Sequence, residues 1–219
     1  MQELRRKGHE VGRYKVRALM REAGLKCKQR RPQRYRSSGT EALIAENQLK
    51  RNFEVSTINE VWCGEVIYIQ VGRRWMYLAV VIDLYARRLV GWAFSMIADA
   101  NLACNALRIA AESRGRPADV MFHSDQGCQY TSHKFRAVLE EYSFNLSMSH
   151  RDQCWDNAAM ERFFGALKSE WIPAGGYGTE AQARRYIQSY LMRYNLKHLH
   201  SYNGSEPPVA MEEKLKAVA

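Results

Sequence analysis

The amino-acid sequence predicts an α/β protein in which a mixed sheet carries helices on both faces and a small basic helical segment comes first. Three runs rich in Val, Ile, Tyr and Trp, at 62–70, 75–84 and 88–95, are joined by short connectors, so we expect an antiparallel meander. Helix-like and strand-like segments then alternate from residue 99, which adds further strands to the same sheet. The excess of Lys and Arg lies entirely before the first of these strands.

Two short helices are predicted at the N-terminus. Residues 13–23 carry apolar side chains at helical spacing, and Gly24 follows at a position where helix ends favour glycine. Residues 2–8 fit the end of a preceding helix. We therefore interpret residues 1–31 as part of a helix-turn-helix DNA-binding segment, with an ordinary pair of basic helices as the alternative.

The positive charge is concentrated in the same region. Residues 1–51 hold 15 Lys and Arg against 5 Asp and Glu, whereas the remaining residues hold 18 of each kind. A solvated tail is the simple interpretation of such a run, but the block includes Tyr35 and adjoins helices, which favours contact with nucleic acid. The side chains expected to contact DNA here are Arg13, Lys15, Lys26, Lys28, Arg30, Arg31, Arg34 and Arg36.

A polar, irregular stretch at 32–57 is predicted to be a basic linker, with one short helix at 40–50. The main domain then occupies residues 58–219, and 46% hydrophobic residues are enough for a buried core. We find neither a signal peptide nor an apolar run near the roughly 18 residues of a membrane span. The five cysteines form no CxxC pair, which argues against a disulfide framework or a structural zinc and favours a reducing compartment.

The second half of the sheet and its helices are expected from six further segments. In chain order these are a helix at 99–113, a strand at 118–122, a helix at 132–142, a strand at 144–149, and helices at 157–171 and 179–196.

Glu65 is the first residue that suggests chemistry. It lies in the middle of an apolar strand and shares one face with Cys63 and Ile67. A carboxylate among such neighbours costs free energy unless it is paired or bound to a metal. An edge strand with Glu65 facing solvent is the alternative.

Two later carboxylates have the spacing of a shared metal site. Asp125 directly follows a strand, where ligand sites in α/β sheets tend to lie, and Gly127 allows a tight turn beside it. Glu161 and Lys168 are seven residues apart on the helix at 157–171, so they project along one face beside its buried stripe. A polar turn and an exposed helix pair are the simpler alternatives. With Glu65, these acids are able to hold two divalent ions roughly 3.5–4 Å apart.

The order and spacing of many segments resemble those of the DDE integrase-type transposases of bacterial insertion sequences, which are relatives of retroviral integrases. The matching segments are 75–88, 90–92, His123-Ser124-Asp125-Gln126-Gly127, 129–132, 147–149, Cys154-Trp155-Asp156-Asn157, 160–164, 167–170, 194–195 and 200–201. Together they extend over nearly the whole chain, which makes the resemblance specific. By the same resemblance Asp83 matches a family residue that is not one of the three metal-binding acids, and we expect it to cap the turn before Arg87.

The resemblance implies a ribonuclease H-like catalytic core at 58–219, with Glu65, Asp125 and Glu161 as its metal-binding catalytic acids. It implies two Mg²⁺ or Mn²⁺ ions, one activating water or a DNA 3′-hydroxyl and the other stabilising the departing oxygen. Lys168 occupies a position at which such enzymes contact DNA near the reacting phosphate. Neither a covalent enzyme intermediate nor ATP is required.

This chain departs from the family pattern at two positions of the core. Glu65 stands where the family has Asp, and Ile67-Tyr68 replaces the usual Thr-Tyr pair. Glu keeps the charge but shifts the carboxylate by about 1 Å, and a misplacement of that size can cost about 100-fold in rate. Reduced activity is therefore expected, with complete loss as the alternative. His198 replaces an Arg, which affects a phosphate or acid contact rather than the fold.

The resemblance also implies the partners. They are DNA, both element ends and target, and further copies of the chain in a homo-multimer on DNA. Family members usually begin with a longer helix-turn-helix region and are often fused to an upstream reading frame. We therefore expect such a DNA-binding partner or fusion, with a truncated or decayed copy as the alternative. The expected location is the bacterial cytoplasm, at the nucleoid, with no membrane partner.

Two other functions share parts of this pattern. A ribonuclease H-like nuclease would use the same acids to cut DNA without joining it, although the basic N-terminal block favours a transposase. A non-catalytic DNA-binding remnant of a transposase is the second alternative, which Glu65 favours.

Overall fold

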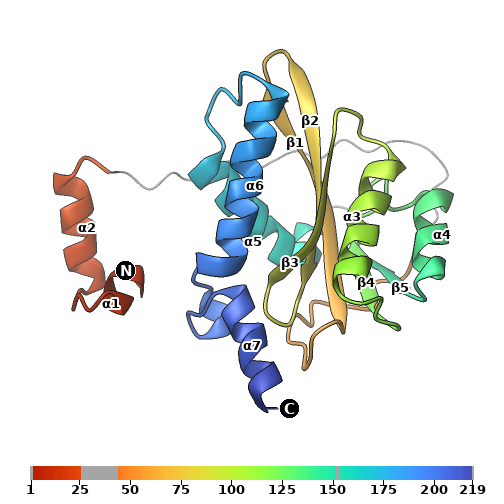
Figure 1. Cartoon of the computed structure of the whole chain (residues 1–219), viewed down its shortest axis with the longest axis horizontal. Helices are drawn as coiled ribbons and strands as arrows, with labels where there is room; N and C mark the ends of the chain where they lie inside the picture. The colour runs from red at the N-terminus through yellow and green to blue at the C-terminus, as the bar shows by residue number, and fades with distance from the viewer. Residues whose placement is uncertain (1, 26–43, 151–152, 219) are drawn as a thin grey trace.

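The first three strands form the predicted antiparallel meander in the computed structural model (Figure 1). The structure describes residues 2–25, 44–150 and 153–218. The strands are β1, Val61–Val71, β2, Arg74–Asp83, and β3, Arg88–Ser95. Their β-branched and aromatic residues suit a pleated, half-buried surface, and short connections keep successive strands adjacent.

Two parallel strands extend the sheet on the other side of β1. They are β4, Met121–Ser124, and β5, Asn145–Met148, and the strand order is β3-β2-β1-β4-β5. The predicted strand at 118–122 begins three residues too early. The reason is that Asp119 has a φ of +60°, in the left-handed region, so the chain bends before the strand begins.

Two helices cover one face of this sheet. α3 spans Ala100–Ser113 and α4 spans His133–Glu141. Each begins at a short polar side chain, Asp99 or Ser132, that accepts a hydrogen bond from a backbone amide of the first turn. Their apolar sides enclose a core that includes the fully buried Trp62.

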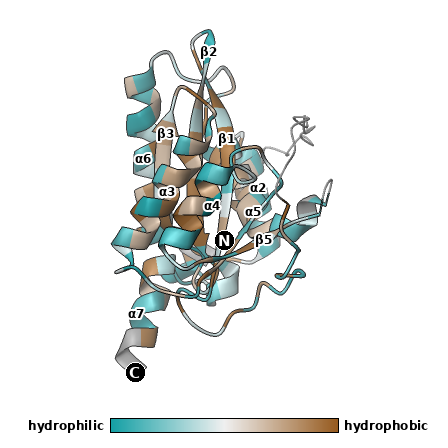
Figure 2. Cartoon of the chain, turned by 90° about the vertical axis from the view of Figure 1, so that its right-hand side faces the viewer, coloured by the Kyte–Doolittle hydropathy of each residue, from teal (hydrophilic) through white to brown (hydrophobic). Residues whose placement is uncertain are grey.

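The opposite face is covered by α5, Ala158–Ala166, and α6, Glu180–Lys197 (Figure 1). The single helix predicted at 157–171 is divided. A 3-10 turn at Cys154–Asn157 precedes α5, and a π-helical turn at Leu167–Trp171 follows it. Figure 2 shows hydrophobic residues along the sheet and hydrophilic residues on the outward sides of the helices, the pattern of a two-faced core.

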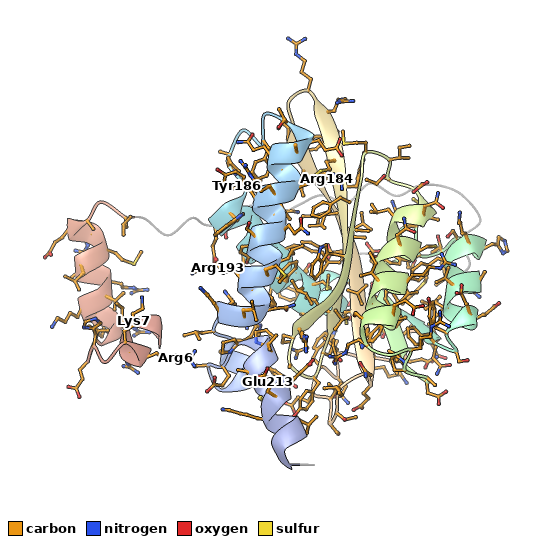
Figure 3. All side chains as sticks on the ribbon, viewed as in Figure 1. Arg6, Lys7, Arg184, Tyr186, Arg193 and Glu213 are labelled. Atoms are coloured by element: carbon orange, nitrogen blue, oxygen red, sulfur yellow. The ribbon has the colours of Figure 1, made fainter. Side chains whose placement is uncertain are left out.

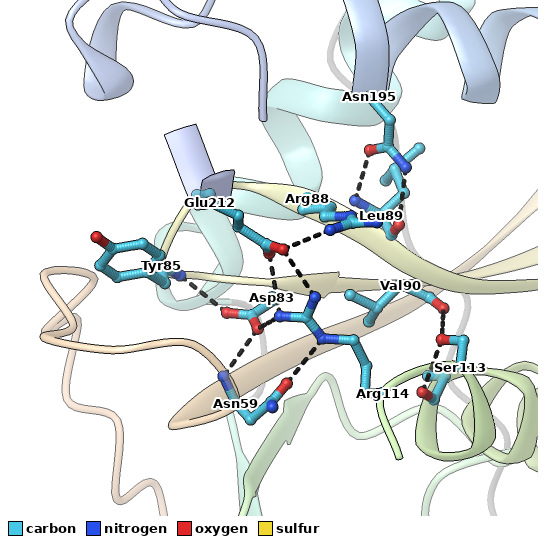
Figure 4. Close-up of polar contacts among 12 residues, drawn as sticks. Asn59, Asp83, Tyr85, Arg88, Leu89, Val90, Ser113, Arg114, Asn195 and Glu212 are labelled. Atoms are coloured by element: carbon cyan, nitrogen blue, oxygen red, sulfur yellow. Dashed lines mark hydrogen bonds and ion pairs between the residues drawn. The ribbon is translucent and has the colours of Figure 1, made fainter. Parts of the chain in front are cut away.

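The last helix, α7, Pro208–Val218, was not predicted; it follows a 3-10 turn at Ser201–Asn203. Glu212 of α7 is buried and forms ion pairs with Arg88 at 2.5 Å and Arg114 at 2.8 Å (Figure 4). These two ion pairs fasten the C-terminal helix to the core.

The two helices predicted at the N-terminus are present as α1, Gln2–Arg6, and α2, Arg13–Glu22. No residue of α2 is buried, and Gly24 follows it with a φ of +66°. An ion pair of 3.2 Å joins Arg6, labelled in Figure 3, to Glu206 of the main domain. The predicted DNA contacts that lie outside the described residues are Lys26, Lys28, Arg30, Arg31, Arg34 and Arg36.

The described part of the predicted linker lies against the main domain. Asn47 and Leu49 are buried, and the backbone amides of Gln48 and Leu49 donate to Ser147 Oγ at 3.0 and 3.2 Å. Residues 44–48 contain no helix, so the helix predicted at 40–50 is wrong in this part. None of the described helices is both long and apolar enough to cross a membrane.

Candidate active site

Glu65 lies at the centre of the sheet, so the solvent-facing alternative is wrong. β1 is the third of five strands, and the Oε2 atom of Glu65 is buried without a hydrogen-bond partner among the described residues. Burial, and then the charge of Asp125, raise the pKa of Glu65 to about 8. Lys168 opposes this shift and Glu161 adds to it. The other three predicted site residues of the core therefore all lie within electrostatic reach of Glu65.

The register of the parallel strands explains why Asp125 is near Glu65. β4 pairs His123 with Cys63 of β1, and Asp125 and Glu65 each come two residues later. Because neighbouring strands lie about 4.8 Å apart and paired residues face the same side, both carboxylates are directed to one face. Asp125 Oδ1 accepts a hydrogen bond of 3.0 Å from the Gly127 amide. A Cβ on Gly127 would lie 2.9 Å from this oxygen, so a larger residue there would push the Asp125 carboxylate out of this position.

α5 brings Glu161 to the same face of the sheet. The predicted buried stripe is confirmed at Met160, Phe163, Phe164 and Leu167, whereas Trp171 is half-buried. Glu161 is half-buried beside this stripe. Asn157 Nδ2 donates to the backbone carbonyl of Gly64 at 3.4 Å, which ties the start of α5 to the residue before Glu65.

Lys168 extends the charged side of this helix into the π-helical turn. Its side chain is half-buried. Burial lowers the pKa of Lys168, and the negative charge of Glu65 opposes that shift. π-helical turns inside α-helices frequently mark functional sites, and this one carries the cation that faces the acids.

The chemistry of these acids suits a hard divalent cation. Carboxylate oxygens are the ligands that Mg²⁺ and Mn²⁺ prefer, and the buried Oε2 of Glu65 is an atom that a cation would satisfy. Over the described ranges, however, no three His, Cys, Asp or Glu side chains are close enough to hold a metal ion as they stand. The charges of Asp125 and Glu161 nevertheless act on Glu65.

A buried polar network holds the turn that precedes α5. Asp156 accepts hydrogen bonds from Asn47 Nδ2 at 3.0 Å and from the His150 amide at 3.2 Å. Its other oxygen accepts from Arg51 Nε at 2.6 Å. Burial alone would raise the pKa of Asp156, but the hydrogen bonds from Arg51 and His150 hold it below its ordinary value.

A short polar residue just before a helix predicts a side-chain N-cap, but neither Asp156 nor Asn157 forms one for α5. Asn157 occupies the N-cap position of α5 without a side-chain hydrogen bond to the helix. Asp156 instead binds Asn47, which is 109 residues away in sequence. No local sequence pattern links positions so far apart, so this contact was not predictable.

Tyr130 is a second residue that the sequence analysis does not single out, although it lies in the matching segment 129–132. It is buried, and its pKa rises well above the ordinary value, first through burial and then through the charges of Asp125 and Glu65. The Tyr130 hydroxyl oxygen lies 3.3 Å from the position that a Cβ on Gly64 would occupy. Gly64 therefore leaves room first for the Phe122 ring, 2.4 Å from the same position, and then for this hydroxyl.

His123 lies in the same motif as Asp125 but has a structural role. Its ring is buried, and its Nδ1 is 2.9 Å from Ser147 Oγ. Burial lowers the pKa of His123 to about 4, so the ring is neutral at neutral pH. A neutral, enclosed imidazole supports the sheet rather than carrying charge in the site.

The remaining predicted residues lie away from the acids or outside the described part. Arg13 and Lys15 are exposed on α2, and no contact within the described ranges joins them to the acids. Asp83 accepts a hydrogen bond of 3.0 Å from the Tyr85 amide, which confirms its predicted role in the turn before Arg87 (Figure 4).

Comparisons with known proteins agree with this arrangement. Two models of the integrase core domain match residues 56–154 and 142–208, and a model of an HTH-like domain matches residues 1–33. Transposase InsF for insertion sequence IS3A of Escherichia coli (strain K12) is 37% identical over 216 residues, 97% of this chain and 74% of that protein. A 31 kDa protein of insertion element IS600 from Shigella sonnei is 33% identical over 99% of this chain and 80% of its own length.

Solved structures confirm the predicted ribonuclease H-like fold. The HTLV-2 integrase catalytic core domain, in complex with magnesium, has a TM-score of 0.53 and 15% identity over 70% of this chain and 96% of that one. A chain of the simian T-cell lymphotropic virus intasome, solved in complex with PP2A regulatory subunit B56 gamma, has a TM-score of 0.60 and 14% identity. That match covers 78% of this chain and 59% of the other chain. With the transposase relatives, these similarities show that the chain belongs to the insertion-sequence transposases of the DDE, retroviral-integrase-like family of polynucleotidyl transferases.

Proposed function

We propose that this transposase performs metal-dependent DNA cleavage and strand transfer with Glu65, Asp125 and Glu161 as its catalytic acids. One observation supports this assignment above the others. Glu65 Oε2 is buried without a partner among the described residues, next to two acids that raise the pKa of Glu65. Such a group destabilises the fold by itself, and a bound cation is the partner that would offset that cost.

The three carboxylates would hold two Mg²⁺ or Mn²⁺ ions. When bound, the ions supply charge stabilisation at the phosphodiester oxygens and lower the pKa of the attacking water or 3′-hydroxyl. The HTLV-2 integrase core of similar fold was solved with magnesium. Asp125 is oriented in advance by the Gly127 amide. Lys168, half-buried beside Glu65, would neutralise a DNA phosphate at the site.

We assign the parts of the chain as follows. Residues 1–31 would bind DNA through Arg13, Lys15 and the basic side chains that follow. Residues 32–57 would connect this segment to residues 58–219, the catalytic core. The HTH-like match at residues 1–33 supports the first assignment. Transposition joins two DNA ends, so the active form would be a homo-multimer on DNA. An upstream-frame fusion partner would add end recognition, and the protein would act at the bacterial nucleoid.

The test is a strand-transfer assay with Mn²⁺. Its substrate is a duplex carrying the terminal sequence of the encoding element with an exposed 3′-hydroxyl, and its target is a plasmid. Asp125→Asn and Glu161→Gln keep the size of each side chain and remove its charge, so both should abolish joined products. DNA affinity should change by less than about threefold, because cationic side chains supply most of it. Joined products from Asp125→Asn at the unaltered rate would refute the assignment.

A non-catalytic DNA-binding remnant is the second candidate, because no three potential ligands cluster among the described residues. Calorimetric titration with Mn²⁺ separates the two. A remnant would bind no Mn²⁺ in a manner that depends on Asp125, although it would still bind DNA in a salt-dependent way. A ribonuclease H-like nuclease would bind the metal and cut DNA, but would yield no joined product.

A further inference from the structure

Trp155 is exposed although the two residues that follow it are buried. Its side chain is 68% exposed, whereas the next two residues, Asp156 and Asn157, are 2% and 5% exposed. Among the described large hydrophobic residues, only Tyr14 on α2 is more exposed. Keeping an indole in water forgoes the stabilisation that its burial would supply.

The exposure of Trp155 does not result from a loosely held turn. Asp156 is fixed by Asn47 at 3.0 Å and by Arg51 at 2.6 Å, and Asn157 is fixed by the carbonyl of Gly64 at 3.4 Å. The backbone next to the indole is thus anchored to two other parts of the main domain. The ring is presented to solvent from a rigid support, which limits the entropy that a ligand contact would cost.

The turn lies at the same edge of the sheet as the candidate acids. Gln126, the residue after Asp125, donates from Nε2 to the Ser149 carbonyl at 3.0 Å. The next amide, that of His150, donates to Asp156 at 3.2 Å. A continuous chain of contacts therefore leads from the acid-bearing loop after β4 to the residue beside Trp155.

The polar surroundings of Trp155 indicate the class of ligand. The Arg51 side chain is 51% exposed and that of His150 is 72% exposed, while their acidic partner Asp156 is only 3% exposed. Arg51 and His150, which both bind the residue next to Trp155, therefore also present a cation and an imidazole to solvent at this turn. The matching ligand would offer a flat apolar face to the indole and negative charge to Arg51. A nucleotide has both, and it fits better than an apolar peptide or a lipid.

We propose that Trp155 stacks on a nucleobase of the DNA strand that carries the reacting phosphodiester, next to that phosphodiester. The proposal rests on the proposed function, which places a DNA phosphate at the acids. Such a base would leave the helical stack and lie against the indole, with Arg51 on the adjoining phosphate. Because the Glu65 side chain is half-buried, an unstacked nucleotide allows the backbone to approach it more closely than an intact duplex does.

The experiment replaces Trp155 in the full chain and uses the terminal duplex with 2-aminopurine at each of the three nucleotides nearest the reacting 3′ end in turn. 2-Aminopurine fluoresces more strongly when it leaves the base stack, and a stacked indole then quenches it. Trp155→Phe keeps an aromatic face and should retain strand transfer within about threefold. Trp155→Leu keeps apolar volume without that face, and strand transfer should fall by about 10- to 100-fold, the range that base–aromatic stacking supports. The unaltered protein should change the fluorescence on binding at one of the three positions, and Trp155→Leu should not produce that change.

Trp75, 49% exposed on β2, offers a matched control, and Trp75→Leu should alter neither readout. Unchanged strand transfer and unchanged fluorescence in Trp155→Leu would overturn the proposal. An abasic nucleotide at the responding position should make the unaltered protein and Trp155→Leu equal in rate, and a persisting difference would also overturn it. The fluorescence is read in Ca²⁺ without catalysis, so failure of strand transfer in every variant would contradict the proposed function and leave the stacking result valid.

Discussion

The Arg114 guanidinium donates to Asp83 Oδ2 at 2.9 Å, with both side chains almost fully enclosed by the main domain (Figure 4). The same guanidinium also binds Glu212 of α7. One cation therefore compensates two carboxylates that are 129 residues apart in sequence, and joins the end of β2 to the C-terminal helix.

Replacing Arg114 with Met should destabilise the fold strongly. The change keeps much of the side-chain volume but leaves Asp83 and Glu212 buried without this partner, which typically costs about 3–5 kcal/mol. Urea unfolding followed by tryptophan fluorescence would measure the loss. Arg116→Met is the control, because its ion pair with Glu112 is exposed and screened by solvent, so its loss should change the stability little. Equal losses in the two variants would show that burial of the Arg114 pairs has no special importance.

Shortening Glu65 to Asp should raise Mn²⁺-dependent strand transfer. The family has Asp at this position, and a carboxylate moved by about 1 Å can change the rate by about 100-fold. The gain should appear in kcat rather than in DNA affinity, because Glu65 is not a DNA-binding cation. Single-turnover kinetics with pre-bound DNA would measure it, with Glu65→Gln as the inactive reference. An equal or lower rate for the Asp variant would show that the longer side chain already reaches its position.

Mn²⁺ binding should strengthen as the pH rises from 6 to 9. The pKa of Glu65 is raised from its ordinary value of 4.5 to about 8, so in the metal-free protein the neutral form is favoured below that value. This raised pKa stabilises the metal-free fold most at low pH, and the contribution is lost as the pH rises from about 4.5 to about 8. Metal requires the carboxylate, so binding below pH 8 releases a proton.

Calorimetry in buffers of different ionisation enthalpy would count that proton. Glu65→Gln, which is neutral at every pH, should remove both the proton release and the increase in affinity. Proton release that persists in this variant would assign the titration to another group.

The sheet was predictable because its signals are local. The residues of β1, β2 and β3 show strand composition within each segment, and the short connectors determine their pairing. The start of β4 was missed because Asp119, a residue type that tolerates left-handed backbone, turns the chain first. α7 was missed because its position depends on Glu212 meeting Arg88 and Arg114, which lie far away in sequence.

The same distinction applies to the site. Asp125 and Glu161 are recognisable from their motifs, and the position of Asp125 beside Glu65 follows from the strand register. The partners of Asp156 are not recognisable in this way, since Asn47 and Arg51 come from a segment that resembles a linker. A polar segment that contributes buried hydrogen bonds has no composition that distinguishes it from a solvated one.

The parallel register between β1 and β4 has a mechanical consequence. Glu65 lies on β1 and Asp125 directly follows the last residue of β4, so the backbone pairing of these two strands limits how far the two acids can move apart. Glu161 is carried by α5, whose distance from the sheet depends on side-chain packing and on the Asn157 contact with Gly64. A change that shifts α5 by a fraction of a helical turn would therefore tune metal affinity continuously. The sheet thus positions two of the acids, and the packing of one helix, α5, sets the position of the third.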